Sequence, residues 1–86
     1  MSEQKKKTWK LYQFSVVSGN SPDTAILGDN QILGVFDSEE RANIELNGLL
    51  RSIMLDGIQF QKITDSSAFI LGRDLRPIHF LECLFT

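Results

Sequence analysis

His79 and Cys83 could in principle form a nucleophile–base pair, and each is the single residue of its type in this chain of 86 residues. Such a pair requires hydrogen-bond contact between the thiol and the imidazole. Residues 78–86 are rich in apolar and aromatic side chains, which predicts a strand. On a strand the two side chains share a face but lie roughly 13 Å apart. We therefore expect no catalysis from either residue.

A cofactor or metal site is not indicated either. One histidine and one cysteine cannot supply a structural zinc site, which needs four such ligands. Gly28 and Gly34 precede a predicted helix, as the glycines of a phosphate-binding loop do. However, the acidic residues Asp37, Glu39 and Glu40 occupy the helix start, where they would repel a phosphate. We expect no bound cofactor.

Arg73 and Arg76 flank Asp74 in a polar loop near the end of the chain. Because a guanidinium presents a planar fork to carboxylates, the two arginines could hold an acidic partner. Alternatively, they could pair with Asp74 and otherwise face solvent. Both interpretations are open, and we keep the two arginines as candidate partner-binding residues.

Strand-forming side chains determine most of the predicted secondary structure. Strands are expected at residues 9–17, 31–36, 58–64 and 78–86. Gly28, Asp29 and Asn30 suit a turn with positive φ, either in a tight hairpin or in a loop before the second strand. Residues 68–71 are either a short strand or a helical turn capped by Asp65.

The best-determined element is a helix that starts at the sequence Asp37-Ser38-Glu39-Glu40. These residues suit a capping box, in which the Asp37 side chain accepts from the Glu40 amide. The helix should run to about Leu55, with Gly57 as a left-handed stop. At about 100° per residue, one stripe of apolar residues should face the sheet. It consists of Ala42, Leu46, Leu49, Leu50 and Ile53, with Met54 at its margin.

The opposite side of this helix is apolar too, because Ile44, Gly48 and Leu55 line up beside Arg51. A helix on one sheet has no internal need for a second apolar side. A glycine inside a helix also costs about 1 kcal/mol relative to alanine, which invites an explanation such as close packing. Scattered surface apolarity is the alternative. We name Ile44, Gly48, Arg51 and Leu55 the outer stripe and predict that it binds a partner.

These elements predict a single α+β domain over residues 9–86, preceded by a disordered basic tail over residues 1–8. The expected fold has two layers: one helix packed on a mainly antiparallel sheet of about four strands, in the order β-β-α-β-β. Residues 78–86 are apolar on both faces, so this strand should be central or covered by another chain. In the second case, strand pairing could produce a homodimer.

Composition restricts the partners and the compartment. The formal net charge is −2, which argues against a dedicated nucleic-acid binder. A single cysteine allows no internal disulfide, which favours the cytoplasm. No apolar run approaches the ~20 residues of a membrane span. The alternative function is a nucleic-acid or small-ligand binder that uses a basic-aromatic patch. That patch would comprise Lys5, Lys6, Lys7, Trp9, Lys10 and Tyr12.

Residues 34–42, GVFDSEERA, resemble a strand-to-helix junction, G-V-F/Y-S-S-x-E-x-A, of small uncharacterised bacterial and phage domains. The resemblance covers residues 9–63. It implies a similar strand–loop–strand–helix–strand order, and it transfers no activity and no functional residue. The resemblance, the small size and the acidic charge together lead us to expect a non-catalytic protein-binding module. A bacterial or phage inhibitor, immunity or anti-defence protein would fit.

Overall fold

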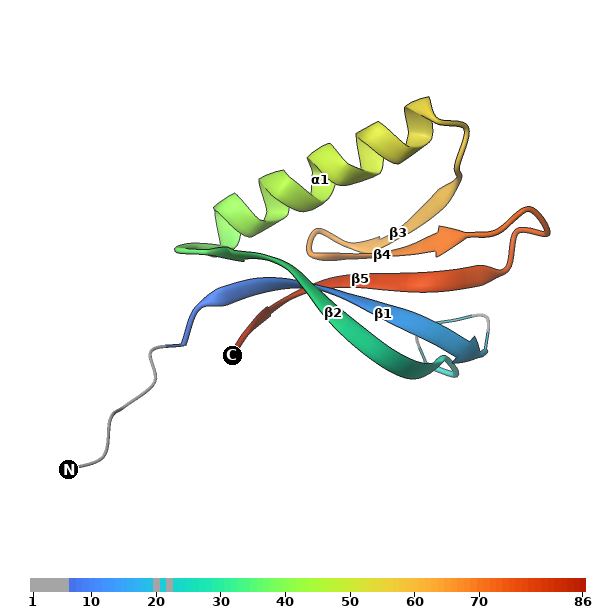
Figure 1. Ribbon diagram of the computed structural model, residues 1–86, viewed down its shortest axis with the longest axis horizontal. Coiled ribbons are helices and arrows are strands. Elements are labelled where there is room, and N and C mark those ends of the chain that lie inside the picture. Colours follow the sequence, from blue (N-terminus) through green and yellow to red (C-terminus); the bar gives the residue numbers. More distant parts are fainter. Residues whose placement is uncertain (1–6, 20, 22) are drawn as a thin grey trace.

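The computed structural model describes residues 7–19, 21 and 23–86, and in these residues it contains one helix and five strands. The elements are β1 (Trp9–Ser18), β2 (Ile26–Phe36), α1 (Glu39–Leu55), β3 (Phe60–Thr64), β4 (Ser67–Leu71) and β5 (Pro77–Phe85). The strands form one antiparallel sheet in the order β2-β1-β5-β4-β3, and α1 packs on one face (Figure 1). The predicted α+β class is confirmed, but the expectation of about four strands is wrong because β4 forms a strand rather than a helical turn.

The last strand, β5, is the centre of the sheet. It pairs with β1 on one side and with β4 on the other, which explains why it is apolar on both faces. Both of its edges are therefore paired over most of its length in the described residues, so its two apolar faces need no second chain to explain them. The homodimer stays a prediction. Thr8 extends the pairing, since its amide and carbonyl both bond to Thr86 at 3.0 Å.

The predicted turn at Gly28, Asp29 and Asn30 lies inside β2 instead. Asn30 pairs with Phe14 of β1 and Leu27 with Val16, and Gly28 and Asp29 form an irregularity in the register between these two pairs. Gly28 is not among the described residues with positive φ. A Cβ at Gly28 would lie 2.8 Å from the Ser15 hydroxyl, so a larger residue there would force the side chains of β1 to move. Pairing with a long neighbouring strand overrides the local preference for a turn.

The helix begins one residue later than the capping prediction. Ser38 is the N-cap, with extended backbone geometry, and its hydroxyl accepts from the Arg41 amide at 3.2 Å. The predicted cap, Asp37, instead lies 4.0 Å from the Arg41 guanidinium as an exposed ion pair. Gly57 has φ of +84° and its amide bonds to the Met54 carbonyl, so the predicted left-handed stop is confirmed.

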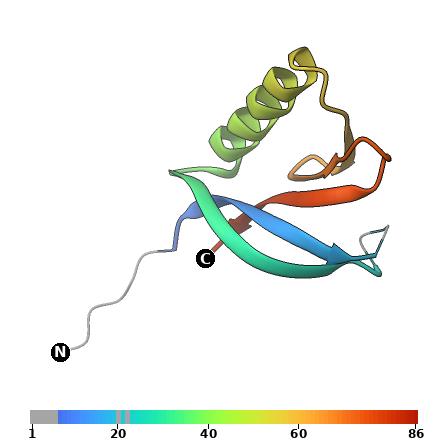
Figure 2. The ribbon, with the colours of Figure 1, turned by 45° about the vertical axis from the view of Figure 1, so that its right-hand side comes forward.

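The main core lies between α1 and the sheet. The predicted inner stripe is confirmed: Ala42, Leu46 and Leu50 are buried. Leu49 and Ile53 are partly buried against the same cluster. From the sheet, this core takes Leu11, Ala68, Ile70, Leu81 and Cys83, with Trp9, Phe36 and Phe60 at its margin. Figure 2 shows the helix standing over one face of the sheet while β1 and β2 twist away beneath it.

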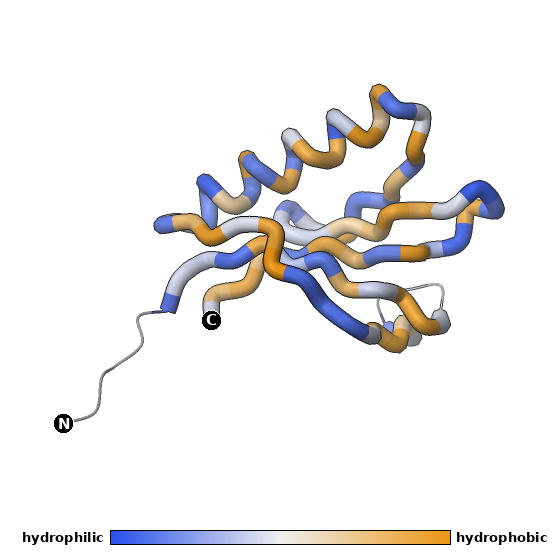
Figure 3. Tube along the Cα trace, viewed as in Figure 1, coloured by the Kyte–Doolittle hydropathy of each residue, from blue (hydrophilic) through white to orange (hydrophobic). Residues whose placement is uncertain are grey.

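A second apolar cluster covers the opposite face. Phe80 has Phe14 and Phe69 as cross-strand neighbours, with ring centroids 6.3 and 5.0 Å away. Phe69 is only 1% exposed although no helix covers this face in the described part of the chain. Ala25, just before β2, and Leu27 line a cavity of about 30 Å³ together with Phe69 and Phe80. Figure 3 shows the apolar ends of β2 on either side of its polar middle.

Candidate protein-binding surface

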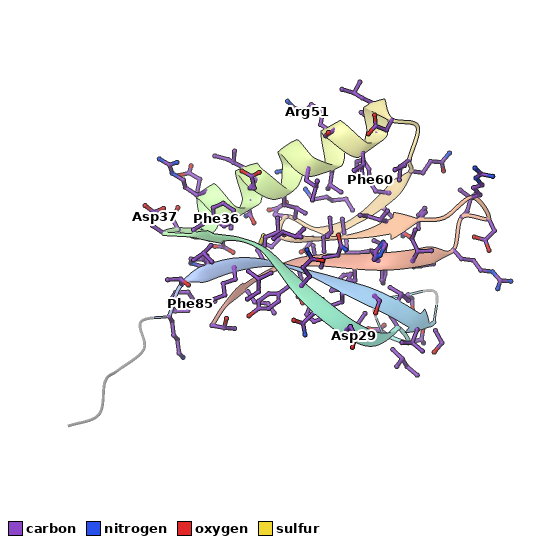
Figure 4. The ribbon with its side chains drawn as sticks, viewed as in Figure 1. Asp29, Phe36, Asp37, Arg51, Phe60 and Phe85 are labelled. Atoms are coloured by element: carbon purple, nitrogen blue, oxygen red, sulfur yellow. The ribbon has the colours of Figure 1, made fainter. Side chains whose placement is uncertain are left out.

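The outer stripe is exposed along α1. Ile44 is 64% and Leu55 81% exposed, and Arg51 and Gly48 are exposed as well. A Cβ at Gly48 would meet no atom within 4 Å, so nothing within the described chain requires a glycine there. Figure 4 shows Arg51 on the side of α1 that faces away from the sheet. The helix therefore presents an apolar side that the described fold does not use.

A groove runs beside the outer stripe, between α1 and β3. It consists of two cavities of about 370 and 460 Å³, and both are lined by Met54 and Phe60. The first cavity is also lined by Asn47, Leu50, Arg51 and Lys62, and the second by Gly57, Ile58 and Gln59. We call these two cavities together the α1–β3 groove. In Figure 4, Phe60 lies between β3 and the helix.

Two cations line the groove, both in its first cavity. Lys62 reaches across it, and its ammonium group donates to the Asn47 side-chain oxygen at 2.7 Å. Arg51 lines the same cavity. Within the described residues, neither cation forms an ion pair with a carboxylate, and no acidic residue lines either cavity. The groove therefore combines an apolar floor with two cations that have no acidic counterpart.

The two arginines predicted to bind a partner, in the loop after β4, lie in different surroundings. Arg76 binds Asp74: its guanidinium lies 3.7 Å from the carboxylate, and its amide donates to the same group at 3.2 Å. Arg73 instead lines a third cavity, of about 710 Å³, at the C-terminal end of α1. The outer stripe contributes no residue to this cavity. The two arginines and the outer stripe therefore do not form one site.

The same loop contains an unusual backbone conformation. Leu75 has φ of +64°, a region that bulky residues rarely adopt, and its side chain is exposed at the rim of the 710 Å³ cavity. Its amide bonds to the Gly72 carbonyl at 3.0 Å, which closes a turn before the chain enters β5. Glycine usually occupies such a position after a type I turn. The sequence contains no signal that predicts leucine there.

The two residues considered for catalysis differ in their surroundings. Cys83 is buried in the main core, and burial, followed by the negative charges of Glu39 and Glu82, raises the pKa of its thiol to about 11. The thiol is therefore protonated and unreactive at neutral pH. His79 lies on the same strand but lines the 710 Å³ cavity. Among the described residues, no three His, Cys, Asp or Glu side chains gather as a metal site would require.

The described residues bring only part of the alternative basic-aromatic patch together: Lys10 and Tyr12 both bond to Thr86, whereas Trp9 lies on the other face of the sheet. Trp9 packs at the margin of the main core and lies 5.3 Å from the Phe85 ring. Tyr12 lies on the opposite face, where it stacks on Phe14. The ammonium group of Lys10 donates to the Thr86 carbonyl at 2.6 Å. Lys5 and Lys6 lie outside the described residues, as does most of the predicted tail.

Sequence reasoning identified Arg51 but missed the groove next to it. Asn47, Phe60 and Lys62 had no assigned role, because they come from two elements whose proximity is a tertiary feature. One signal was available: Phe60 and Lys62 are two residues apart on a strand and so share a face.

In the described part of the chain, no helix is long and apolar enough to cross a membrane. Comparison of the chain with protein-family models, curated proteins and solved structures gives no match.

Proposed function

We propose that this chain is a non-catalytic protein-binding module that contacts another protein through the outer stripe of α1. The observation that carries the proposal is the exposure of Ile44 and Leu55 on a helix whose inner side already fills the main core. When a partner covers an exposed apolar residue that contributes nothing to the fold, the free energy of binding becomes more favourable. Covering a leucine or isoleucine fully contributes about 1.5–3 kcal/mol.

Arg51 adds a directional polar interaction to this contact. It stands between the two apolar residues along the helix, and arginine is enriched among the residues that dominate binding energies. Arg73 and Arg76 lie outside the proposed contact, because one faces the end cavity and the other binds Asp74. The contact is therefore built on one rigid helix. A preformed surface loses little conformational entropy on binding.

A small acidic protein with a preformed contact surface suits the role of an inhibitor, immunity or anti-defence protein of a bacterium or phage. Such a protein acts by occupying its target and needs no reactive group of its own. The neutral, buried thiol of Cys83 and the lone His79 agree with this role.

Capture of the partner from a lysate of the native host tests the proposal. We expect the unmodified chain to retain a specific protein, and Ile44→Asp and Leu55→Asp to lose it, because a charge would be desolvated in the contact. Val17→Asp is the matched control, since Val17 is 67% exposed on β1, away from the helix. Retention by both helix variants, or equal loss with the control, would contradict the proposal.

A further inference from the structure

We propose that the α1–β3 groove binds an extended segment of the partner, which adds a strand to the edge of β3. The segment carries an apolar residue and an acidic residue two positions apart. This inference rests on the proposed function and specifies the chemistry of the partner. It is carried by three features of the groove: a free strand edge, a shared direction of two side chains, and an unbalanced charge.

The first feature is the edge of β3. This strand ends the sheet and pairs with β4 alone among the described elements. The Leu71 amide bonds to the Gln59 carbonyl at 2.9 Å. Because hydrogen-bonded positions alternate along an antiparallel pair, Gln61 also directs its backbone groups to β4. The backbone groups of Phe60 and Lys62 therefore point to the free edge, where an added strand can bond to them.

The second feature is the common direction of the Phe60 and Lys62 side chains. Their cross-strand partners on β4 are Ile70 and Ala68, and both of these belong to the core beneath α1. Residues that lie opposite each other in a sheet share a face. An added strand would thus place one side chain beside Phe60 and another, two residues away, beside Lys62, both facing the helix.

The helix determines what these two side chains should be. Met54 and Phe60 line both cavities of the groove, so the position beside Phe60 suits an apolar side chain. Methionine adapts its shape readily, as peptide-binding surfaces require. Lys62 and Arg51 line the cavity of about 370 Å³ with no carboxylate beside them. The position beside Lys62 therefore suits glutamate or aspartate.

The other sheet edge is a poorer acceptor. β2 is longer, but its pairing with β1 contains three register shifts, which disturb the regular edge that an added strand needs. The segment Ile26–Phe36 also contains no lysine and no arginine. The β2 edge therefore offers no cation that would select an acidic partner. At β3, a regular edge over residues 60–62 occurs together with the unbalanced cations, although the register shifts once beyond Lys62.

Two synthetic peptides of equal composition can test the inference by NMR titration of the ¹⁵N-labelled chain. TETVTET places valine and both glutamates on one strand face and reads the same in either direction, so strand polarity does not matter. TTEVETT moves the glutamates to the opposite face. We expect saturable shifts of the amides of Phe60, Lys62 and Met54 with TETVTET. Binding of TTEVETT should be weaker by up to about fivefold for each ion pair that is lost, because rim ion pairs contribute up to about 1 kcal/mol each.

The double variant Arg51→Glu/Lys62→Glu should weaken TETVTET binding by a similar factor, whereas Val17→Asp should bind it as the unmodified chain does. Both groove positions are exposed, and the amide spectrum of each variant shows directly whether it is folded. Equal binding of the two peptides, shifts confined to other elements, or no saturable shift at millimolar peptide would overturn the inference. Partner capture that still depends on Ile44 and Leu55 would then leave the proposed function intact.

Discussion

Two regions of the molecule complete their packing in different ways. On the face away from α1, Ala25 and Leu27 lie beside Phe69 of β4 and Phe80 of β5, around a cavity of only about 30 Å³. At the β3 end, the space between the strand and α1 remains open as cavities of about 370 and 460 Å³. The chain thus fills most of the space on the first face with its own hairpin and leaves more space beside β3. This difference motivates the proposal that another molecule completes the packing at the edge of β3, beside the outer stripe.

The two edge strands of the sheet, β2 and β3, also differ in how well they could accept an added strand. β2 exposes several apolar side chains, including Ile32 and Val35, but its irregular register protects it from straight strand addition. β3 is short, and Phe60, Gln61 and Lys62 pair with β4 in unbroken register. An exposed apolar edge is therefore not by itself the best candidate for a binding site. Regular backbone geometry and charge distinguish the two edges.

Removal of the Phe69 ring, on the face away from α1, should have the largest effect on stability. We predict that Phe69→Ala lowers the free energy of unfolding by about 3–5 kcal/mol, because the ring is buried between the sheet and the β1–β2 hairpin. Urea denaturation measures the change. A loss below about 1 kcal/mol would show that the hairpin does not seal this face.

The two sides of α1 should respond unequally to truncation. Leu46→Ala should cost about 2–5 kcal/mol, since Leu46 is fully buried, whereas Ile44→Ala should change stability by less than about 0.5 kcal/mol. Thermal unfolding of the two variants, monitored by circular dichroism, provides the comparison. A substantial loss with Ile44→Ala would mean that the outer stripe supports the fold, and partner binding would no longer be needed to explain it.

A smaller effect of opposite sign is expected at Gly48. Alanine should stabilise the isolated chain by up to about 1 kcal/mol, because a Cβ meets no neighbour there and alanine favours the helix. The urea midpoint should rise accordingly. If the partner's backbone packs against Gly48, the same variant should bind the partner less well. An unchanged or lower midpoint would contradict the packing described for α1.

The smallest predicted effect depends on pH. Burial raises the pKa of Glu82 above its ordinary value of 4.5, so the folded state favours the protonated carboxyl. Stability therefore decreases as the pH rises from below 4.5 through the raised pKa of the folded state. Glu82→Gln should be more stable than the unmodified chain at pH 7 and gain nothing at pH 3. A gain at pH 3 that equals the gain at pH 7 would contradict this assignment.

Local patterns predicted the features that depend on neighbouring residues. The spacing of Ala42, Leu46 and Leu50 identified the inner side of α1, and Gly57 marked its end. The N-cap was assigned one residue too early, because Asp37 and Ser38 are both good caps and differ only in which side chain reaches the third amide. Such ambiguity is inherent in adjacent capping residues.

Features that depend on distant residues could not be predicted in the same way. The segment around Gly28 looks like a turn until its pairing with β1 is known. Residues 68–71 were open between strand and helical turn, and their pairing with both β3 and β5 decides the outcome. The groove required Met54 and Phe60 to come together from two elements. Exposure of the outer stripe was anticipated because it follows from helix geometry alone.

Hydrogen exchange of the chain, with and without the protein captured from the host, tests most directly where the partner binds. We predict slower exchange at the amides of α1 around residues 44–55 and at β3, and unchanged exchange along β2. Protection along β2, with no change in α1 or β3, would contradict the proposed binding surface.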